Sequence, residues 1–416
     1  MNIRSKMSPA FAKLQGGLFA KVTKADVGNS YLELISKGVS PMGWADPFYP
    51  DGRMPEHILK ATIECIETGM ASHYTVPVGN PELRREIAKK LKAFNGIDAD
   101  PDRNILITPG SDSGLFYAML PFIQPGDEVM VLDPSYPNNF LNVELMGGSV
   151  VRIPLREDNG YQPVIDDFKQ RLTDKTKMVL LTHPNNPTTT VFRRRHLEEL
   201  ARFTVENDLV LVVDQAFEDT VFDNLEYVNI ATLPGMWERT VSVFSISKGM
   251  GLSGFRVGYV VADDHIMDVL YGACVSVLGA TNTAAQIGAI AALKDSGFIN
   301  SYREIYDGRR KFAYEVFNSI PGVSMLMPES GFYSWINISR LGDSSEICEF
   351  LIKDAKVAVN DGKAYGLEGK GHIRVIHGAL SNEEQAFDSL LRMKKSFERL
   401  AKDKGIERVV AGPCIV

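Results

Sequence analysis

Short runs of Val, Leu and Ile recur through the middle of the chain and alternate with stretches of helical periodicity. The apolar runs lie at 128–134, 149–155, 177–184, 209–214, 240–245 and 256–262. They do not alternate cleanly with polar residues, which is typical of strands buried on both faces of a mainly parallel sheet. Between two of them, residues 196–208 have apolar positions at helical spacing, namely Leu197, Leu200, Ala201 and Val205. This alternation predicts an α/β fold with right-handed crossovers.

The character of the sequence changes after about residue 300. Residues 301–320 have the spacing of a long amphipathic helix, short runs separated by turn residues follow, and a terminal helix is expected from about Asn382 to Lys404. We expect a smaller α+β domain here, packed closely on the first because no Ser/Pro/Gly-rich linker separates the two. The expected divisions are an N-terminal arm that contributes to the small domain and the substrate side (1–53), a large domain (54–298) and a small domain (299–416).

The composition is that of a globular protein and argues against two functional classes. Of 416 residues, 44% are hydrophobic and 23% are charged, which excludes a wholly disordered chain. The formal net charge is −7, so the chain lacks the broad positive field that drives non-specific nucleic-acid binding. We therefore expect no nucleic-acid partner.

The cysteines and the length of the apolar runs indicate the compartment. The four cysteines form no CxxC pair and are too scattered for a disulfide framework or a structural zinc site; they are Cys65, Cys274, Cys348 and Cys414. The N-terminus lacks the apolar segment of a secretory signal, and no apolar run approaches the ~20 residues that cross a bilayer. We expect a cytoplasmic protein with no metal centre and no membrane partner.

Polar side chains follow the ends of several predicted strands. Tyr136, Asn186, Asp214 and Ser245 each come at or just after the end of an apolar run. In folds of this class, ligands bind at the carboxyl ends of the strands. These side chains are therefore candidates for one common site.

Lys248 is the candidate with the most specific chemistry. An isolated lysine is usually a solvated surface residue, but this one follows an apolar strand and precedes a glycine-rich turn. A lysine shielded from water has a lowered pKa and can act as a nucleophilic amine. Ser245, Ser247 and Arg256 are suited to bind a phosphate group. An amine beside a phosphate site predicts a phosphorylated aldehyde as ligand, and pyridoxal 5′-phosphate (PLP) fits.

Residues 245–259, SISKGMGLSGFRVGY, resemble the PLP-lysine motif of the class I/II aminotransferases, the aspartate aminotransferase-like family of fold type I. Six further segments match that family in the same order: YTVPVGNPELR (74–84), TPGSDSGL (108–115), DPSYPN (133–138), HPNNPT (183–188), DQAF (214–217) and HIRV (372–375). The spacings are 28 residues from Asn186 to Asp214, 34 to Lys248 and a further 126 to Arg374. Seven motifs in order are far more specific than one. The resemblance implies a large domain with a mainly parallel sheet of the seven-stranded type between helices.

The resemblance assigns the residues that contact the cofactor ring. It implies that Lys248 forms the internal aldimine with PLP and later transfers the proton between Cα and the cofactor C4′. Asp214 would pair with the protonated pyridine nitrogen, which makes the ring an electron sink; the structural alternative is a helix N-cap. Asn186 would donate to the 3′-oxygen, and it can also shape its turn. Tyr136 would stack on the ring, although a strand-end tyrosine is more often core.

The phosphate and substrate contacts follow from the same resemblance. Ser111 and Asp112 begin a helix whose main-chain N–H groups would bind the phosphate, because a carboxylate side chain is out of place there. Arg374 would hold the substrate α-carboxylate in a bidentate pair, unless it forms only a surface salt bridge. Asn186 is also expected on the substrate side. Tyr74 would reach the phosphate of a neighbouring subunit, which implies a homodimer with shared active sites.

The chain departs from the family pattern at three places. Phe217 stands where a tyrosine usually donates to the PLP 3′-oxygen, so the pKa of the aldimine should rise. Thr189 replaces a glycine and should alter only its loop. The segment at 40–58 has Trp44 and Ala45 near the usual substrate-side glycine. Both are candidate substrate contacts, and Trp44 could instead pack the domain interface.

The expected function is that of a PLP-dependent aminotransferase, which moves an amino group from an amino acid to a 2-oxo acid by a ping-pong cycle. Phe217 leaves open a β-lyase, a decarboxylase or an oxygen-dependent amino-acid oxidase on the same fold. A non-catalytic regulator is a different class. The fold begins within the first fifty residues, which leaves no room for a preceding DNA-binding module, and the chemical residues are all present. The sequence does not indicate the substrate side chain.

Overall fold

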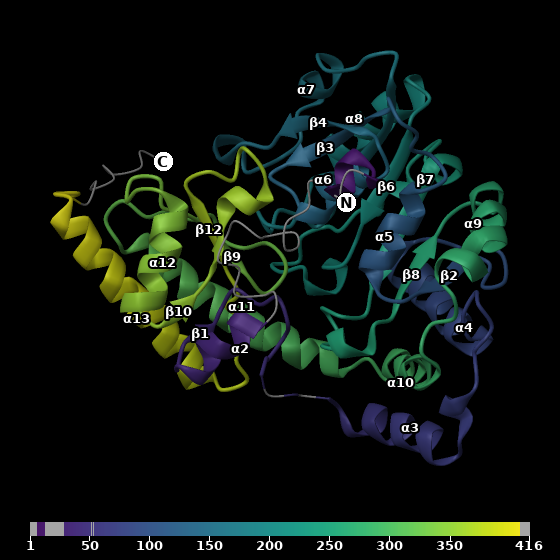
Figure 1. The fold of residues 1–416 in the computed structure, drawn as a ribbon, viewed down its shortest axis with the longest axis horizontal. Helices are drawn as coiled ribbons and strands as arrows, with labels where there is room; N and C mark the ends of the chain where they lie inside the picture. The colour runs from purple at the N-terminus through teal and green to yellow at the C-terminus, as the bar shows by residue number, and fades with distance from the viewer. Residues whose placement is uncertain (1–5, 13–28, 51, 53, 408–416) are drawn as a thin grey trace.

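A computed structural model describes residues 6–12, 29–50, 52 and 54–407 of the chain (Figure 1). Its larger part is built on one seven-stranded sheet with strand order β2-β8-β7-β6-β5-β3-β4. The strands are β2 (Ile105–Thr108), β3 (Glu128–Asp133), β4 (Ser149–Pro154), β5 (Thr176–Thr182), β6 (Val210–Asp214), β7 (Thr240–Ser245) and β8 (Gly258–Val261).

The sheet is mainly parallel, as the sequence predicts. Strands β4, β3, β5, β6 and β7 pair in parallel, and β8 is antiparallel to both of its neighbours, β7 and β2. Each of the six predicted runs falls on a strand. The edge strand β2 is not among the six predicted runs.

Successive residues of the central strands enter different apolar clusters. Met130 and Leu132 of β3 pack in the cluster that includes residues of α8 (Arg194–Glu206). Val129 and Val131 pack instead with residues of α5 (Ser111–Met119), α6 (Pro137–Leu145) and α9 (Asp264–Val277). Because side chains alternate between the two faces of a strand, both faces of this sheet are covered by helices. That burial explains the continuous apolar runs in the sequence.

A third cluster covers the β2 edge of the sheet. Ile105 and Ile107 of β2 pack with apolar residues of α4 (Pro81–Lys90) and α10 (Thr283–Lys294). Beside them, α3 (Glu56–Glu67) lies at the bottom of the view in Figure 1 and contacts α10. Among the described residues, the remaining α-helices before residue 298 are α1 (Pro9–Ala12), α2 (Asn29–Ser36) and α7 (Ile165–Lys169).

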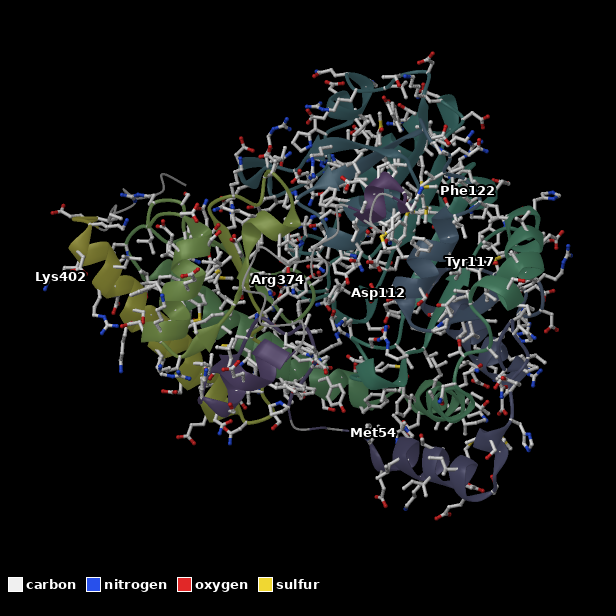
Figure 2. The ribbon with its side chains drawn as sticks, in the orientation of Figure 1. Met54, Asp112, Tyr117, Phe122, Arg374 and Lys402 are labelled. Atoms are coloured by element: carbon white, nitrogen blue, oxygen red, sulfur yellow. The ribbon has the colours of Figure 1, made fainter. Side chains whose placement is uncertain are left out.

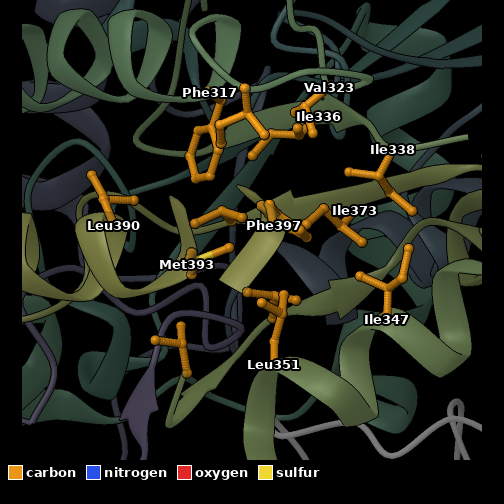
Figure 3. Packing of buried hydrophobic residues seen from close by; sticks show 14 of the residues in the cluster. Phe317, Val323, Ile336, Ile338, Ile347, Leu351, Ile373, Leu390, Met393 and Phe397 are labelled. Atoms are coloured by element: carbon orange, nitrogen blue, oxygen red, sulfur yellow. The ribbon is translucent and has the colours of Figure 1, made fainter. Parts of the chain in front are cut away.

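The C-terminal part has its own small antiparallel sheet and its own core. The sheet has the order β11-β12-β9, with β9 (Ser334–Asn337), β11 (Asn360–Asp361) and β12 (His372–Val375). Its helices are α11 (Phe298–Asn318), α12 (Ser344–Asp354) and α13 (Glu383–Asp403). Figure 3 shows their apolar side chains, among them Phe317, Leu351 and Phe397, gathered around Ile373 of β12. This is the α+β organisation that the sequence predicts.

The N-terminal segment is joined to the C-terminal part. Strand β1 (Ser40–Pro41) pairs in parallel with β10 (Val357–Ala358). Helix α11 begins at Phe298, next to the boundary predicted at 298/299. The division into an arm and two domains remains a prediction. Cys414 and the start of the predicted arm lie outside the described residues. Within the described part of the chain, no helix is both long enough and apolar enough to span a bilayer.

Candidate active site

One cavity of about 460 Å³ gathers most of the predicted site residues between the large sheet and the C-terminal part. That volume is within the usual range for a small-molecule site. Figure 2 places Asp112 at the large-sheet side and Arg374 on the C-terminal side of this region. The cavity is lined by twelve of the predicted residues: Trp44, Ala45, Ser111, Asp112, Tyr136, Asn186, Asp214, Phe217, Ser247, Lys248, Arg256 and Arg374.

Lys248 follows β7 and points into the cavity. Its Nζ donates a hydrogen bond of 2.5 Å to the main-chain oxygen of Ala45. Burial lowers the pKa of Lys248, and the charges of Asp112 and Asp46 oppose that shift. A lysine with a lowered pKa has more of the neutral amine that attacks an aldehyde. This is the environment that the sequence predicts.

Asp214 is the last residue of β6 and is buried beneath the cavity. Burial is the main reason that the pKa of Asp214 is raised to about 7; the Ala216 N–H that donates to Oδ1 at 3.1 Å opposes this shift, and the charge of Asp112 adds to it. A carboxylate in this setting is stabilised by a cationic N–H partner. A protonated pyridine nitrogen is such a partner, so Asp214 fits the role that the sequence assigns. The alternative role of a helix N-cap does not apply, because Phe217 and not Asp214 precedes the short helical turn at Glu218–Thr220.

The start of α5 and Arg256 form the end of the cavity at which the sequence predicts a phosphate group. Gly110 caps α5 with a φ of 83°, and no side chain caps the helix there. A Cβ at Gly110 would lie 2.3 Å from Nη2 of Arg256, so only glycine allows the guanidinium to lie against this turn. Arg256 itself has a φ of 51° and donates to the Ser253 oxygen at 2.9 Å. A helix N-terminus beside a guanidinium suits a phosphate group.

Asp112 lies next to this end with its carboxylate turned towards Tyr136. The hydroxyl of Tyr136 donates to Oδ1 of Asp112 at 3.1 Å, and Nδ2 of Asn138 donates to the same oxygen at 3.2 Å. Oδ2 is 3.9 Å from Arg256. The side chain is thus engaged with the Tyr136 hydroxyl, which fits the expectation that Asp112 would bind a phosphate through its main chain. Burial, and then Asp112, raise the pKa of Tyr136.

Arg374 projects from β12 into the cavity, while its neighbours Ile373 and Val375 enter the core of Figure 3. Its Nη1 donates to Oδ1 of Asn186 at 2.9 Å. Its Nε and Nη2 donate to Oδ1 of Asn360 at 3.2 and 2.8 Å. Arg374 is only 3% exposed, so the alternative of a surface salt bridge does not apply. A buried guanidinium held by neutral amide oxygens retains its charge for an anionic ligand.

The three departures from the family pattern lie at defined places. Phe217 lines the cavity and packs edge-on against Tyr333, with ring centroids 5.0 Å apart. Trp44 also lines the cavity, and its ring centroid is 5.8 Å from that of Tyr49. Thr189 lies outside the cavity lining, is buried, and has a φ of 68°, in the left-handed region that glycine favours.

The structure does not bring two predicted residues into the cavity lining. Ser245 is buried and its Oγ accepts the N–H of Ser247 at 3.1 Å, whereas Ser247 itself lines the cavity. Tyr74 is 98% exposed in the single chain. Its predicted role concerns a neighbouring subunit and remains a prediction.

Sequence reasoning missed several lining residues. Ser253 and Gly254 fall inside the motif that carries Lys248, so their position in the glycine-rich turn was an available signal. Tyr365 and its neighbour Asn360, which holds Arg374, had no such signal, because neither belongs to a matched segment.

Comparison with protein families and curated proteins adds to this geometry. Residues 40–387 match the family model described as aminotransferase class I and II. An aspartate aminotransferase of Pyrococcus abyssi is 33% identical over 383 residues, covering 89% of this chain and 95% of that protein. Aromatic-amino-acid aminotransferase 2 of Thermococcus litoralis is 32% identical over 369 residues, covering 86% of this chain and 92% of that protein.

Solved structures show the same architecture. An aromatic aminotransferase from Pyrococcus horikoshii OT3 has a TM-score of 0.82 at 31% identity and covers 90% of this chain and 99% of that one. An aspartate aminotransferase from Thermus thermophilus with maleate has a TM-score of 0.84 at 27% identity, covering 95% of this chain and 99% of that one. Both similarities extend over nearly the whole described chain.

Proposed function

This chain belongs to the class I and II aminotransferase family and is an aminotransferase, and we propose that its cofactor is PLP, carried by Lys248 in the cavity described above. The observation that carries the proposal is that Lys248, Asp214 and Arg374 line one cavity, although they lie on separate strands or loops. The family resemblance, fold and names of the relatives all support it.

The residues present fit the three polar ends of PLP. The α5 N-terminus, Ser247 and Arg256 suit the phosphate. Asp214 suits a protonated ring nitrogen, because its buried carboxylate gains a cationic partner there. Asn186, at the opposite side, has its Nδ2 available for the phenolic oxygen, since its Oδ1 accepts from Arg374.

When bound, PLP supplies an electron sink for the electron pair released as a Cα–H bond of an amino acid breaks. Arg374 would bind the α-carboxylate and so fix the orientation of Cα. The neutral amine of Lys248 would accept the proton from Cα and donate it to C4′ of the cofactor. Asp214 would keep the ring nitrogen protonated. Trp44 and Tyr365, which line the cavity, would limit the access of water.

The proposed substrates are an amino acid donor and a 2-oxo acid acceptor. Relatives of this chain are named for aspartate, aromatic amino acids and LL-diaminopimelate. Among the described residues that line the cavity, the arginines are Arg256 and Arg374. A substrate that carries a side-chain carboxylate besides its α-carboxylate would therefore need a cation from outside this cavity lining.

A homodimer is part of the proposal. The fully exposed Tyr74 lies close in sequence to a row of exposed apolar side chains on α3, namely Leu59, Ile63 and Ile66. Exposed apolar rows of this kind mark protein interfaces. A cytoplasmic location is likewise proposed, supported by the free thiols of Cys65, Cys274 and Cys348.

The comparisons do not favour a β-lyase, a decarboxylase or an oxidase, since the named relatives are aminotransferases. The deciding experiment adds single amino acids to the PLP-loaded protein. We expect the spectrum to change to that of the pyridoxamine form without release of ammonia, and a 2-oxo acid to reverse the change. Ammonia release without an acceptor would contradict the proposal.

The attachment site has a separate test. Borohydride treatment of the PLP-loaded protein should label Lys248, as read by peptide mass spectrometry. Lys248→Ala should abolish both labelling and turnover, whereas Lys90→Ala, which removes a lysine outside the cavity, should leave the label in place. A label on another lysine would refute the assignment.

A further inference from the structure

The end of β3 clamps a loop of the C-terminal part. The carboxylate of Asp133, which is 1% exposed, accepts the main-chain N–H groups of Leu367 at 2.9 Å and Glu368 at 3.1 Å. Nη1 of Arg152 donates to the same carboxylate at 2.8 Å. Two residues further on, the N–H of Ser135 donates to the main-chain oxygen of Tyr365 at 2.8 Å. The segment 133–135 thus holds three main-chain groups of the loop 365–368: the Tyr365 oxygen and the N–H groups of Leu367 and Glu368.

Gly366 makes the approach possible. It has a φ of 130°, and a Cβ at this position would lie 2.0 Å from Oδ1 of Asp133. No side chain larger than hydrogen fits there without moving the loop or the carboxylate. The contact therefore depends on a residue from each side: the carboxylate of Asp133 and the absence of a side chain at Gly366.

The clamped loop carries one of the supports of Arg374. Tyr365 lines the cavity, and its ring centroid lies 4.8 Å from Cζ of Arg374, within the range of a cation–π contact. Its hydroxyl donates to Oδ1 of Asn360 at 3.4 Å, the oxygen that accepts two bonds from Arg374. A displaced Tyr365 would weaken the contact of its ring with the guanidinium. It would also disturb Asn360, which accepts hydrogen bonds from that guanidinium.

We infer that Asp133 is a positioning residue for substrate binding: through the loop 365–368 and Tyr365, it sets the orientation in which Arg374 meets the substrate carboxylate. The inference rests on the proposed function, because it concerns the substrate of that reaction. Asp133 does not line the cavity, so its effect passes through Tyr365 and Arg374.

Asp133→Asn is the direct test, because it keeps the size of the side chain and removes the charge that strengthens its three hydrogen bonds. We expect the KM for the amino donor to rise about tenfold, with kcat changed by less than about threefold and the Kd for PLP unchanged. A loss that was only structural would not separate KM from kcat in this way.

Asp167→Asn is the matched control. Asp167 is also buried in the large domain and also binds an arginine, Arg156, at 2.6 and 3.0 Å, but it does not line the cavity. We expect both variants to lower the Tm, and only Asp133→Asn to raise the KM. Equal KM values for the two variants would overturn the inference. So would a Kd for PLP that rises in Asp133→Asn as much as the KM does.

Two further measurements cover other failures. Binding of pyruvate and of 2-oxoglutarate, followed by calorimetric titration, needs no turnover; their Kd should rise about tenfold in Asp133→Asn and stay unchanged in Asp167→Asn. Wild-type protein that binds these probes without transaminating would refute the proposed function, whereas the comparison of Asp133→Asn with Asp167→Asn would still test whether Asp133 positions Arg374 for a carboxylate. If Asp133→Asn does not fold, Tyr365→Phe removes only one hydroxyl and should raise the same Kd about threefold; an unchanged Kd would overturn the inference.

Discussion

The Nη1 of Arg374 donates a hydrogen bond of 2.9 Å to Oδ1 of Asn186, across 188 residues of sequence. Asn186 is expected to contact the cofactor and Arg374 the substrate carboxylate. The oxygen of this side-chain amide thus holds the guanidinium proposed to bind the substrate, and its nitrogen is left for the proposed cofactor.

Replacing Asn186 should affect both ligands. In Asn186→Ala, we expect the Kd for PLP and the KM for the amino donor each to rise about tenfold, because the hydrogen bond proposed to the cofactor and the one that holds Arg374 are both lost. Asn360→Ala is the control, since Asn360 holds Arg374 from outside the cavity lining. It should raise the KM alone. Steady-state kinetics and PLP titration measure the two quantities, and a loss of PLP affinity in Asn360→Ala would contradict the assignment.

The buried Asp214 should make the cofactor-free protein less stable as the pH rises. Burial raises the pKa of Asp214 to about 7, so the folded state binds its proton more tightly than the unfolded state does. The stabilising contribution is thus complete below the unfolded pKa of about 4 and is lost as the pH rises to about 7. Asp214→Asn removes this loss. At about pH 8, its free energy of unfolding should therefore be higher than that of wild type by roughly 2–4 kcal/mol.

At about pH 4, the two cofactor-free proteins should have nearly equal free energies of unfolding, because the carboxyl group is then protonated in the folded state and about half protonated in the unfolded state. Chemical denaturation at the two pH values provides the comparison. A pH-independent difference between Asp214→Asn and wild type would show that the burial of the charge is not its cause.

Asp112 should weaken phosphate binding through its charge. Its Oδ2 lies 3.9 Å from Arg256, so it offsets part of the positive charge that a phosphate would meet. Asp112→Asn keeps an acceptor for Tyr136, and we expect it to bind pyridoxamine 5′-phosphate about threefold more tightly, a modest effect because the side chain is half exposed. Pyridoxamine, which lacks the phosphate, is the control ligand. An equal gain for both ligands in calorimetric titration would point to a cause other than the phosphate.

Phe217 should set the pH at which the absorbance of the PLP-loaded protein changes. Phe217→Tyr adds a hydroxyl that faces the cavity and can donate to the phenolic oxygen, so the midpoint of the absorbance change should move to lower pH. Tyr333→Phe removes a hydroxyl from the neighbouring ring, one that donates to the Asn185 main-chain oxygen at 3.0 Å. This control should leave the midpoint unchanged. A midpoint that shifts in both variants alike would reject the role of Phe217.

Much of the cavity could be predicted because its residues follow local patterns. Asn186, Asp214 and Lys248 each come at or just after a strand end, and parallel strands bring those ends to one edge of the sheet. Ser245 met the same condition, but its hydroxyl is turned to the Ser247 N–H rather than the cavity. The side to which a strand-end side chain turns depends on the backbone of the following turn, which the apolar pattern does not encode.

The sequence alone predicted the layered α/β architecture, because strand burial and helical period are properties of short stretches of chain. Through its motifs it also supplied the proposal for the cofactor and for the side chains that would bind it. Tertiary structure alone decided that Asn186 and Asn360 hold Arg374, that Tyr365 covers it, and that the pKa of Asp214 is raised. Those properties arise where segments far apart in sequence pack together. The desolvation of a charge and the length of a hydrogen bond depend on all the atoms that surround them.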